Sequence, residues 1–311
     1  MSCQNHVKFA VSLSLLVSSS CRLTRANPGQ QPNFEARKMT HQNRAREYLL
    51  YTPPSYNAQI PTPLVIAFHG GSTSHERLAR TTLFHKLADE QGFLVAYPNG
   101  VDGHWNDGRS SSNPEIDDVG FVKLIISEIK RARSLDTARI YATGISNGAF
   151  MTQRLACEQS DRFAAISVVA GSMSAELNAV CQPKRPVPIM FINSPDDTFV
   201  LWQGGEMKRG KGGKMLSVPD SVDFWKNKNN CGQQSEKTLP KKVPQDKTKI
   251  VLREFRNCEN NATVLQYIVH SGGHTWPSGK DQPPWLVGPT TQELDATQES
   301  WNFFKKFKLT E

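Results

Sequence analysis

The sequence predicts an α/β fold with a mostly parallel central sheet covered on both faces by helices. Short apolar runs alternate along the chain with longer segments whose apolar residues recur at helical spacing. The short runs are apolar at nearly every position, which is typical of strands buried on both faces of a parallel sheet. No internal repeat and no Pro/Gly-rich boundary divides the chain, so a single domain is the simpler expectation.

The predicted elements follow one another in a regular alternation. We expect strands at residues 47–51, 64–68, 93–97, 139–143, 165–169, 188–192, 249–256 and 264–269. We expect helices at residues 77–90, 119–133, 149–157, 219–228 and 297–307. The helix at 119–133 follows Asp117 and Asp118, whose negative charge suits a helix N-terminus.

The N-terminal segment has the composition of a secretion signal. Lys8 precedes an apolar run at 9–17, and small residues follow it. This order is typical of a secretory signal, and the run is too short to span a bilayer. Cleavage is expected after Ala26, or before Cys21 with a lipid anchor on that cysteine. The expected location is therefore secreted, periplasmic or at the cell envelope.

After the signal we expect a linker and one folded domain. With the signal placed at 1–26, we expect a polar linker at 27–40 and a single domain at 41–311.

The chain of 311 residues is basic, with a formal net charge of +8. Its lysines crowd into two polar stretches, 208–214 and 237–249. No basic run is interleaved with aromatic residues and no nucleic-acid-binding motif is present, so we expect solvated loops and no nucleic-acid partner. Attraction to an anionic substrate or envelope is the alternative.

Four cysteines lie beyond the N-terminal segment: Cys157, Cys181, Cys231 and Cys258. An even number in an exported protein predicts two disulfides. We favour Cys157–Cys181 and Cys231–Cys258, because each closes a short local loop; the other connectivities stay open. A zinc site is not expected, because no pair has CxxC spacing and no histidine lies nearby in sequence.

The clearest chemical motif is Gly144-Ile145-Ser146-Asn147-Gly148, between a predicted strand and a predicted helix. Such a turn holds its serine in a strained conformation, and its glycines are needed because neighbouring backbone leaves no room for Cβ atoms. Ser146 is therefore the candidate nucleophile. The N–H of Asn147, at the helix start, is a candidate oxyanion donor.

A serine nucleophile needs a base and an orienting carboxylate. His274 lies in a Gly-rich loop after the last predicted strand, and His270 at the strand end is the weaker candidate. Asp197 follows the strand at 188–192, with its neighbour Asp196 as the alternative. The order serine, acid, histidine along the chain fits this assignment.

A second oxyanion donor is expected in the loop His69-Gly70-Gly71-Ser72, which follows the strand at 64–68. Glycines there allow the backbone to approach a substrate closely. The N–H of Gly71 or of Ser72 is the candidate. Trp105 and Trp276 are candidate walls of the substrate pocket, with core packing as the alternative for each.

These motifs occur together in an order that resembles a known family. They are His69-Gly70-Gly71, Tyr97 to Gly100, Trp105-Asn106, Asp117 to Phe121, Gly144 to Phe150, the Asp197 loop, Gly272 to Pro277 and Ala296 to Phe304. From about residue 40 onward the chain resembles the secreted polyhydroxybutyrate depolymerase/feruloyl esterase family of α/β-hydrolases.

The resemblance implies the α/β-hydrolase fold, hydrolysis of carboxylic esters, no cofactor and no metal. It implies catalytic roles for Ser146, Asp197 and His274, and the favoured cysteine pairing looks like the family's. Feruloyl or acetyl esters of polysaccharide, hydroxyalkanoate oligomers and small aryl esters are the expected substrates. A serine peptidase on the same fold and a non-catalytic surface binding protein are the alternatives; the intact set of three residues disfavours the latter.

Overall fold

A ten-stranded sheet organises the residues that the computed structural model describes, which are 32–207 and 211–310. Its order is β1-β2-β4-β3-β5-β6-β7-β12-β11-β10. The strands of this sheet are β1 (Phe34–His41), β2 (Arg44–Tyr51), β3 (Thr62–Phe68), β4 (Leu94–Pro98), β5 (Leu135–Ile145), β6 (Ala165–Val169), β7 (Ile189–Asn193), β10 (Gln233–Thr238), β11 (Lys249–Arg256) and β12 (Val264–His270).

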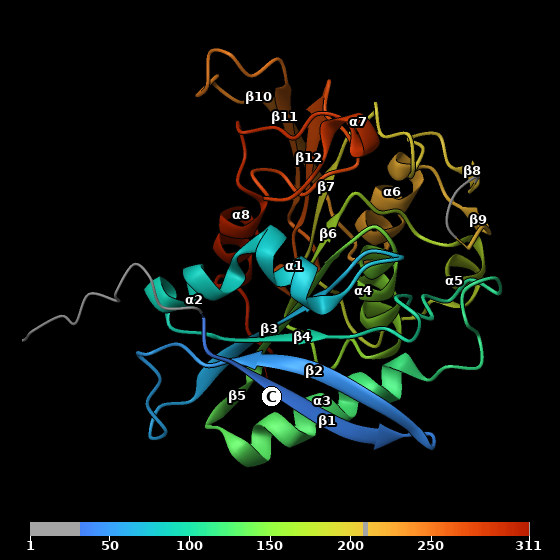
Figure 1. The fold of residues 1–311 in the computed structure, drawn as a ribbon. Helices are drawn as coiled ribbons and strands as arrows, with labels where there is room; N and C mark the ends of the chain where they lie inside the picture. Colours follow the sequence, from blue (N-terminus) through green and yellow to red (C-terminus); the bar gives the residue numbers. More distant parts are fainter. Residues whose placement is uncertain (1–31, 208–210, 311) are drawn as a thin grey trace, which may run out of the picture. The chain divides into compact units, whose positions relative to one another are not determined.

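The middle of the sheet is parallel and both of its edges are antiparallel. Strands β4, β3, β5, β6, β7 and β12 pair in parallel. The hairpins β1–β2 and β10–β11 extend the sheet at its two ends, which Figure 1 shows in blue and in orange. The predicted α/β fold with a mostly parallel sheet is therefore confirmed.

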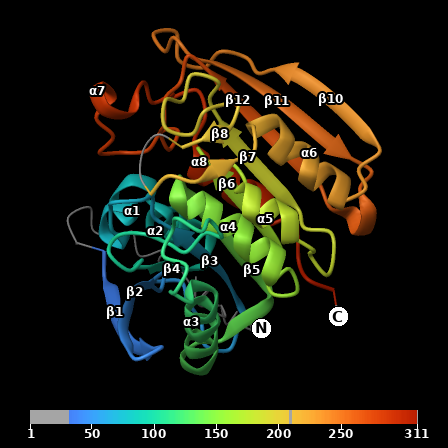
Figure 2. The same cartoon turned by 90° about the vertical axis from the view of Figure 1, so that its right-hand side faces the viewer.

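Helices cover both faces of the sheet. The eight α-helices are α1 (His75–Thr82), α2 (Phe84–Gln91), α3 (Asp118–Ala132), α4 (Asn147–Glu158), α5 (Ala175–Val180), α6 (Val218–Lys228), α7 (Pro284–Val287) and α8 (Ala296–Phe304) among the described residues. Buried side chains of α3, α4, α5 and α6 share one apolar cluster, and those of α1, α2 and α8 share the other. Figures 1 and 2 show the two groups on opposite sides of the sheet.

The alternation of side chains along a strand explains the two clusters. In β3, Leu64, Ile66 and Phe68 lie in one cluster, whereas Val65 and Ala67 lie in the other. A strand buried on both faces needs apolar residues at every position, which is the pattern that predicted it.

The expected linker at 27–40 is wrong for its second half, because Phe34–His41 forms β1 and pairs antiparallel with β2. This edge strand carries Glu35, Arg37 and Lys38, and charged residues on an edge strand resemble a polar linker in sequence. The signal expected at 1–26, with Cys21, lies outside the described residues, as do residues 27–31 of the expected linker.

Several other elements differ from the prediction. The single helix expected at 77–90 is two helices, because Leu83 between them has a φ of 55°. The short strands β8 (Gly205–Glu206) and β9 (Lys214–Met215) form a hairpin where only a loop was expected. Strand β10 was not predicted, because it is exposed at every residue and its sequence contains no apolar run.

Two disulfides join cysteines as favoured from the sequence. Cys157 at the end of α4 bonds Cys181 after α5, and Cys231 bonds Cys258. Disulfides are typical of proteins that fold in an oxidising compartment. Within residues 32–207 and 211–310, no helix is both long and apolar enough to cross a bilayer.

Candidate active site

Ser146 lies on the turn between β5 and α4. Its backbone has φ 57° and ψ −126°, a conformation that is strained for a residue with a side chain. The N–H of Ser146 donates to the carbonyl of Val169 on β6 at 3.0 Å, so the neighbouring strand holds the turn in place. Because Ser146 directly follows β5, it lies at the carboxyl end of the parallel strands, where ligands bind in open α/β sheets.

The two glycines of the turn are sterically required. A Cβ on Gly148 would lie 2.2 Å from the carbonyl oxygen of Phe68, and a Cβ on Gly144 would lie 2.5 Å from the backbone of Gly148. The backbone therefore leaves no space for any larger residue, as the sequence predicted for this motif.

His274 lies in the loop after β12, and this loop is fixed by its own backbone. The N–H of His274 donates to the carbonyl of Val287 at 2.6 Å, and the N–H of Gly273 donates to that of Pro289 at 2.8 Å. The Phe199 ring stacks on the imidazole, with centroids 4.8 Å apart and planes inclined by 17°. Backbone bonds on one side and an aromatic ring on the other restrict the orientation of the histidine.

Asp197 is the carboxylate that contacts this histidine. Its Oδ2 lies 2.7 Å from Nδ1 of His274, and its Oδ1 accepts the N–H groups of Phe199 and Val200 at 2.7 and 2.9 Å. Asp197 is 4% exposed. Asp196 is exposed and accepts the N–H of Ser271 instead. The geometry therefore favours Asp197 over the alternative.

The loop after β3 is organised by a buried histidine. His69 Nε2 accepts the N–H of Gly100 at 2.9 Å, so the ring proton is on Nδ1, which donates to the carbonyl of Gly70 at 2.7 Å. Burial lowers the pKa of His69 to about 4, which keeps the ring neutral. Because a peptide unit is planar and trans, fixing the carbonyl of Gly70 points the N–H of Gly71 in the opposite direction.

Ser72 is excluded as an oxyanion donor. Its N–H already donates to the carbonyl of Gly103 at 2.9 Å, so it is not free to bind a substrate. Of the two alternatives that the sequence left open, Gly71 therefore remains.

The candidate residues converge on one cavity of about 380 Å³. Ser146, Asn147, Gly71 and His274 all line it. Its apolar wall includes Leu78, Ile145, Phe199, Met207, Leu286 and Val287. The candidate serine, histidine and oxyanion donors from the sequence therefore lie at this cavity, whereas its apolar wall was not predicted.

Neither tryptophan expected in the pocket lines it, so both of these predictions are wrong. Trp105 is fully buried, and its indole N–H donates to the carbonyl of His69 at 2.9 Å. Trp276 is 1% exposed, packs against Phe84 and donates to Thr297 Oγ1 at 2.9 Å. Both side chains support the loops of the site from within the core.

Sequence reasoning missed four side chains of the site: His104, Asp107, Arg109 and Phe199. Arg109 and His104 line the cavity, and Asp107 lies behind it. Asp107 directly follows the motif Trp105-Asn106 and Arg109 lies two residues further on, which was the one available signal. In residues 32–207 and 211–310, no group of three or more His, Cys, Asp or Glu side chains could hold a metal ion.

Comparison with known proteins agrees with this geometry. A family model described as esterase PHB depolymerase matches residues 46–195. "Putative esterase NocK" of Nocardia uniformis is 28% identical over 86% of this chain and 81% of its own length. "Feruloyl esterase B" of Piromyces equi is 26% identical over 85% of this chain, which spans only 46% of that relative.

The fold is also found among solved structures. An acetyl xylan esterase from Aspergillus awamori superposes with a TM-score of 0.52 at 14% identity, over 78% of this chain and 94% of that one. The matches in sequence show that the chain is an ester hydrolase that is similar to the polyhydroxybutyrate depolymerase/feruloyl esterase family, and the solved structures show that it has the α/β-hydrolase fold.

Proposed function

We propose that the chain is a secreted serine esterase that hydrolyses carboxylic esters through an acyl-enzyme on Ser146. The observation that carries this proposal is the convergence of a strained serine and a carboxylate-oriented histidine on one cavity. A structural turn would not require that combination.

In the first step, His274 acts as the general base. Its Nδ1–H donates to Asp197, which leaves the lone pair of Nε2 to accept the proton of the Ser146 hydroxyl. The serine oxygen then attacks the ester carbonyl and the carbonyl oxygen becomes negative. The N–H groups of Asn147 and Gly71 donate to that oxygen, the former because the first N–H groups of a helix have no partner within it.

In the second step, the histidine returns its proton to the leaving alcohol and the acyl group remains on Ser146. Water then attacks the acyl-enzyme with His274 again as base, and the acid is released. The fixed tautomer of His274, set by Asp197, serves both halves of the reaction.

The cavity wall bears on the substrate class. Aliphatic and aromatic side chains beside the serine favour an apolar acyl group, and the cationic Arg77 and Lys211 also line the cavity. We propose feruloyl or acetyl esters of polysaccharide, hydroxyalkanoate oligomers or small aryl esters as substrates. The two disulfides and the signal-like N-terminus support export.

The test compares esters with an amide. The purified protein and Ser146→Ala are assayed with p-nitrophenyl butyrate, methyl ferulate, a 3-hydroxybutyrate trimer and a peptide p-nitroanilide. We expect the protein to hydrolyse at least one ester, the anilide to react far more slowly, and Ser146→Ala to lose about 10⁶-fold in kcat. Faster anilide than ester turnover would indicate a peptidase, and no turnover of any substrate would favour a binding protein.

A further inference from the structure

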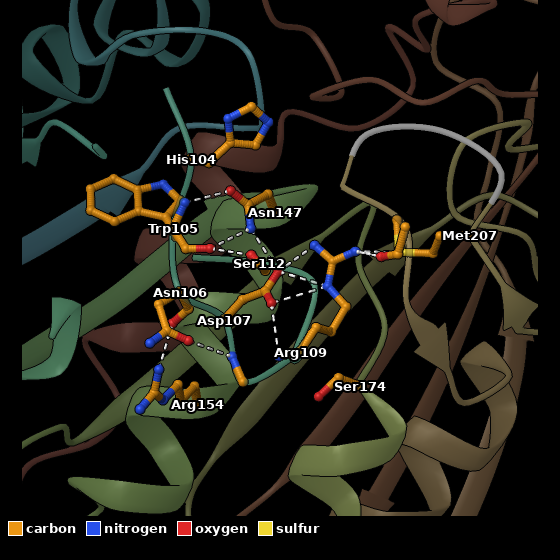
Figure 3. Close-up of polar contacts among 12 residues, drawn as sticks. His104, Trp105, Asn106, Asp107, Arg109, Ser112, Asn147, Arg154, Ser174 and Met207 are labelled. Carbon is orange, nitrogen blue, oxygen red and sulfur yellow. Dashed lines mark hydrogen bonds and ion pairs between the residues drawn. The ribbon is translucent and has the colours of Figure 1, made fainter. Parts of the chain in front are cut away.

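The side chain of Asn147 is held at both ends, although only its backbone N–H has a role in the proposed reaction. Its Oδ1 accepts the N–H of Trp105 at 2.8 Å, and its Nδ2 donates to Oδ2 of Asp107 at 2.6 Å. Figure 3 shows Asn147 between these two residues. The side chain is 6% exposed, so these contacts are shielded from water.

The carboxylate of Asp107 is buried and paired with Arg109. Asp107 is fully buried and Arg109 is 3% exposed. Nε of Arg109 lies 3.0 Å from Oδ1, and Nη2 lies 2.6 Å from Oδ2. This two-point geometry is the strong, directional form of an arginine–carboxylate pair.

The remaining nitrogen of Arg109 contacts the hairpin between β8 and β9. Nη1 donates to the carbonyl of Gly212 at 2.5 Å and lies 2.8 Å from Sδ of Met207. Met207 and Arg109 both line the cavity. One guanidinium therefore joins the carboxylate behind Asn147 to Met207, which lines the cavity; Figure 3 shows Arg109 between Asp107 and Met207.

The charge of Asp107 matters because negative charge develops next to Asn147 during the proposed reaction. An unpaired buried carboxylate one hydrogen bond from the oxyanion donor would repel that charge, and low dielectric strengthens the repulsion. The ion pair with Arg109 neutralises the negative charge of Asp107. The pair thus allows a carboxylate to orient Asn147 without opposing the transition state.

We propose that Asp107 and Arg109 are positioning residues for ester hydrolysis. Asp107 fixes Asn147 and so directs its backbone N–H at the oxyanion, while Arg109 neutralises Asp107 and holds Met207 and Gly212, which lie beside β8 and β9, at the cavity wall. This inference rests on the proposed role of Asn147 in the serine esterase reaction.

The central test is Arg109→Gln against the double variant Asp107→Asn/Arg109→Gln. We expect Arg109→Gln to lower kcat about 100-fold, within the range for loss of an oxyanion donor. Because the double variant has no buried carboxylate, we expect it to recover about 10-fold of that loss. The single variant should also lose affinity for a boronic acid, which binds as a tetrahedral anion.

Arg109→Lys separates the two roles of the arginine. A lysine keeps the positive charge but cannot contact Asp107 at two points and Gly212 at once. We expect kcat to fall less than about 5-fold and KM for p-nitrophenyl butyrate to rise about 5-fold, because the hairpin loses its anchor.

The chain offers a matched control at a second buried arginine–carboxylate pair. Arg46 and Asp118 form a second buried pair, with Nη2 2.6 Å from Oδ1, and Asp118 accepts the N–H of Asn106 rather than contacting Asn147. Arg46→Gln leaves an unpaired buried carboxylate away from the cavity. It should lower Tm as Arg109→Gln does, yet keep kcat per active site within about 2-fold.

Active sites are counted with a fluorophosphonate, so unfolded protein does not affect kcat. Equal kcat losses in Arg109→Gln and Arg46→Gln, or no recovery in the double variant, would overturn the inference. If Arg109→Gln does not fold, the inference is tested with Arg109→Lys instead. Unchanged kcat and KM in Arg109→Lys would contradict the inference. A wild-type protein that neither hydrolyses esters nor reacts with the probe would instead refute the proposed function.

Discussion

Asp197 and His274 are joined by a 2.7 Å hydrogen bond between Oδ2 and Nδ1, although 76 residues separate them in the chain. Both side chains are buried, and backbone N–H groups occupy the other carboxylate oxygen. The aspartate therefore has a fixed orientation and sets the tautomer of the imidazole.

Replacing this aspartate tests the assignment of the acid. Asp197→Asn removes the acceptor that keeps the proton on Nδ1, so we expect kcat to fall about 10⁴-fold while the fold is kept. Asp196→Asn is the matched control, because Asp196 is exposed and its carboxylate accepts the N–H of Ser271 rather than contacting His274. Steady-state kinetics measures kcat of both variants. A greater loss of kcat in Asp196→Asn would assign the role of the orienting carboxylate to Asp196.

Replacing a glycine of the nucleophile turn tests the steric argument. Gly148→Ala places a Cβ 2.2 Å from the carbonyl oxygen of Phe68, and we expect a loss of about 3 kcal/mol or more in unfolding free energy. Gly232→Ala is the control, because its Cβ would come no closer than 3.8 Å to the atoms around it. Denaturant titration of both variants measures the difference; equal stability would refute the argument.

The buried His69 predicts a dependence of stability on acid pH. Burial lowers its pKa to about 4, below the 6.5 of an unfolded chain, so the unfolded state binds the proton more readily. The free energy of unfolding is therefore unaffected by His69 protonation above pH 6.5. It falls by about 3 kcal/mol as the pH drops from 6.5 toward 4.

The measurement is Tm against pH for the protein and for His69→Gln, which cannot be protonated. We expect the variant to be less stable at pH 7 and to lose less stability between pH 6.5 and 4. Parallel curves of Tm against pH for the two proteins would show that His69 does not cause the loss of stability in acid.

Each disulfide is expected to stabilise the fold. Their cysteines lie 24 and 27 residues apart, which corresponds to about 3 kcal/mol each in the chain-entropy description. Cys157→Ser/Cys181→Ser and Cys231→Ser/Cys258→Ser should therefore lose similar unfolding free energies in urea. A loss in only one of them would mean that the other bond constrains little in the unfolded chain.

The sequence predicted the centre of the sheet and the turn that carries the candidate nucleophile because both leave local signals. A fully apolar run marks a buried strand, and the glycines around Ser146 mark a turn with no room for side chains. By contrast, β10 is exposed throughout and β1 is charged, so their pairing with β11 and β2 is decided by tertiary contacts.

The walls of the cavity could not be predicted for the same reason. Trp105 and Trp276 are large and close to the motifs in sequence. Both side chains are nevertheless buried in the core, where their indole N–H groups donate to the His69 carbonyl and to Thr297 Oγ1. The proposed roles of Asp107 and Arg109 depend on their contacts with Asn147 and Gly212. These partners lie 40 and 103 residues further along the chain, so the local sequence does not indicate them.

The most direct test of Ser146 as nucleophile is covalent labelling with a fluorophosphonate, followed by mass spectrometry of the peptides. We predict that one equivalent of probe abolishes ester hydrolysis, that the label is on Ser146, and that Ser146→Ala takes up none. A label on another residue, or ester hydrolysis that survives in Ser146→Ala, would contradict the account.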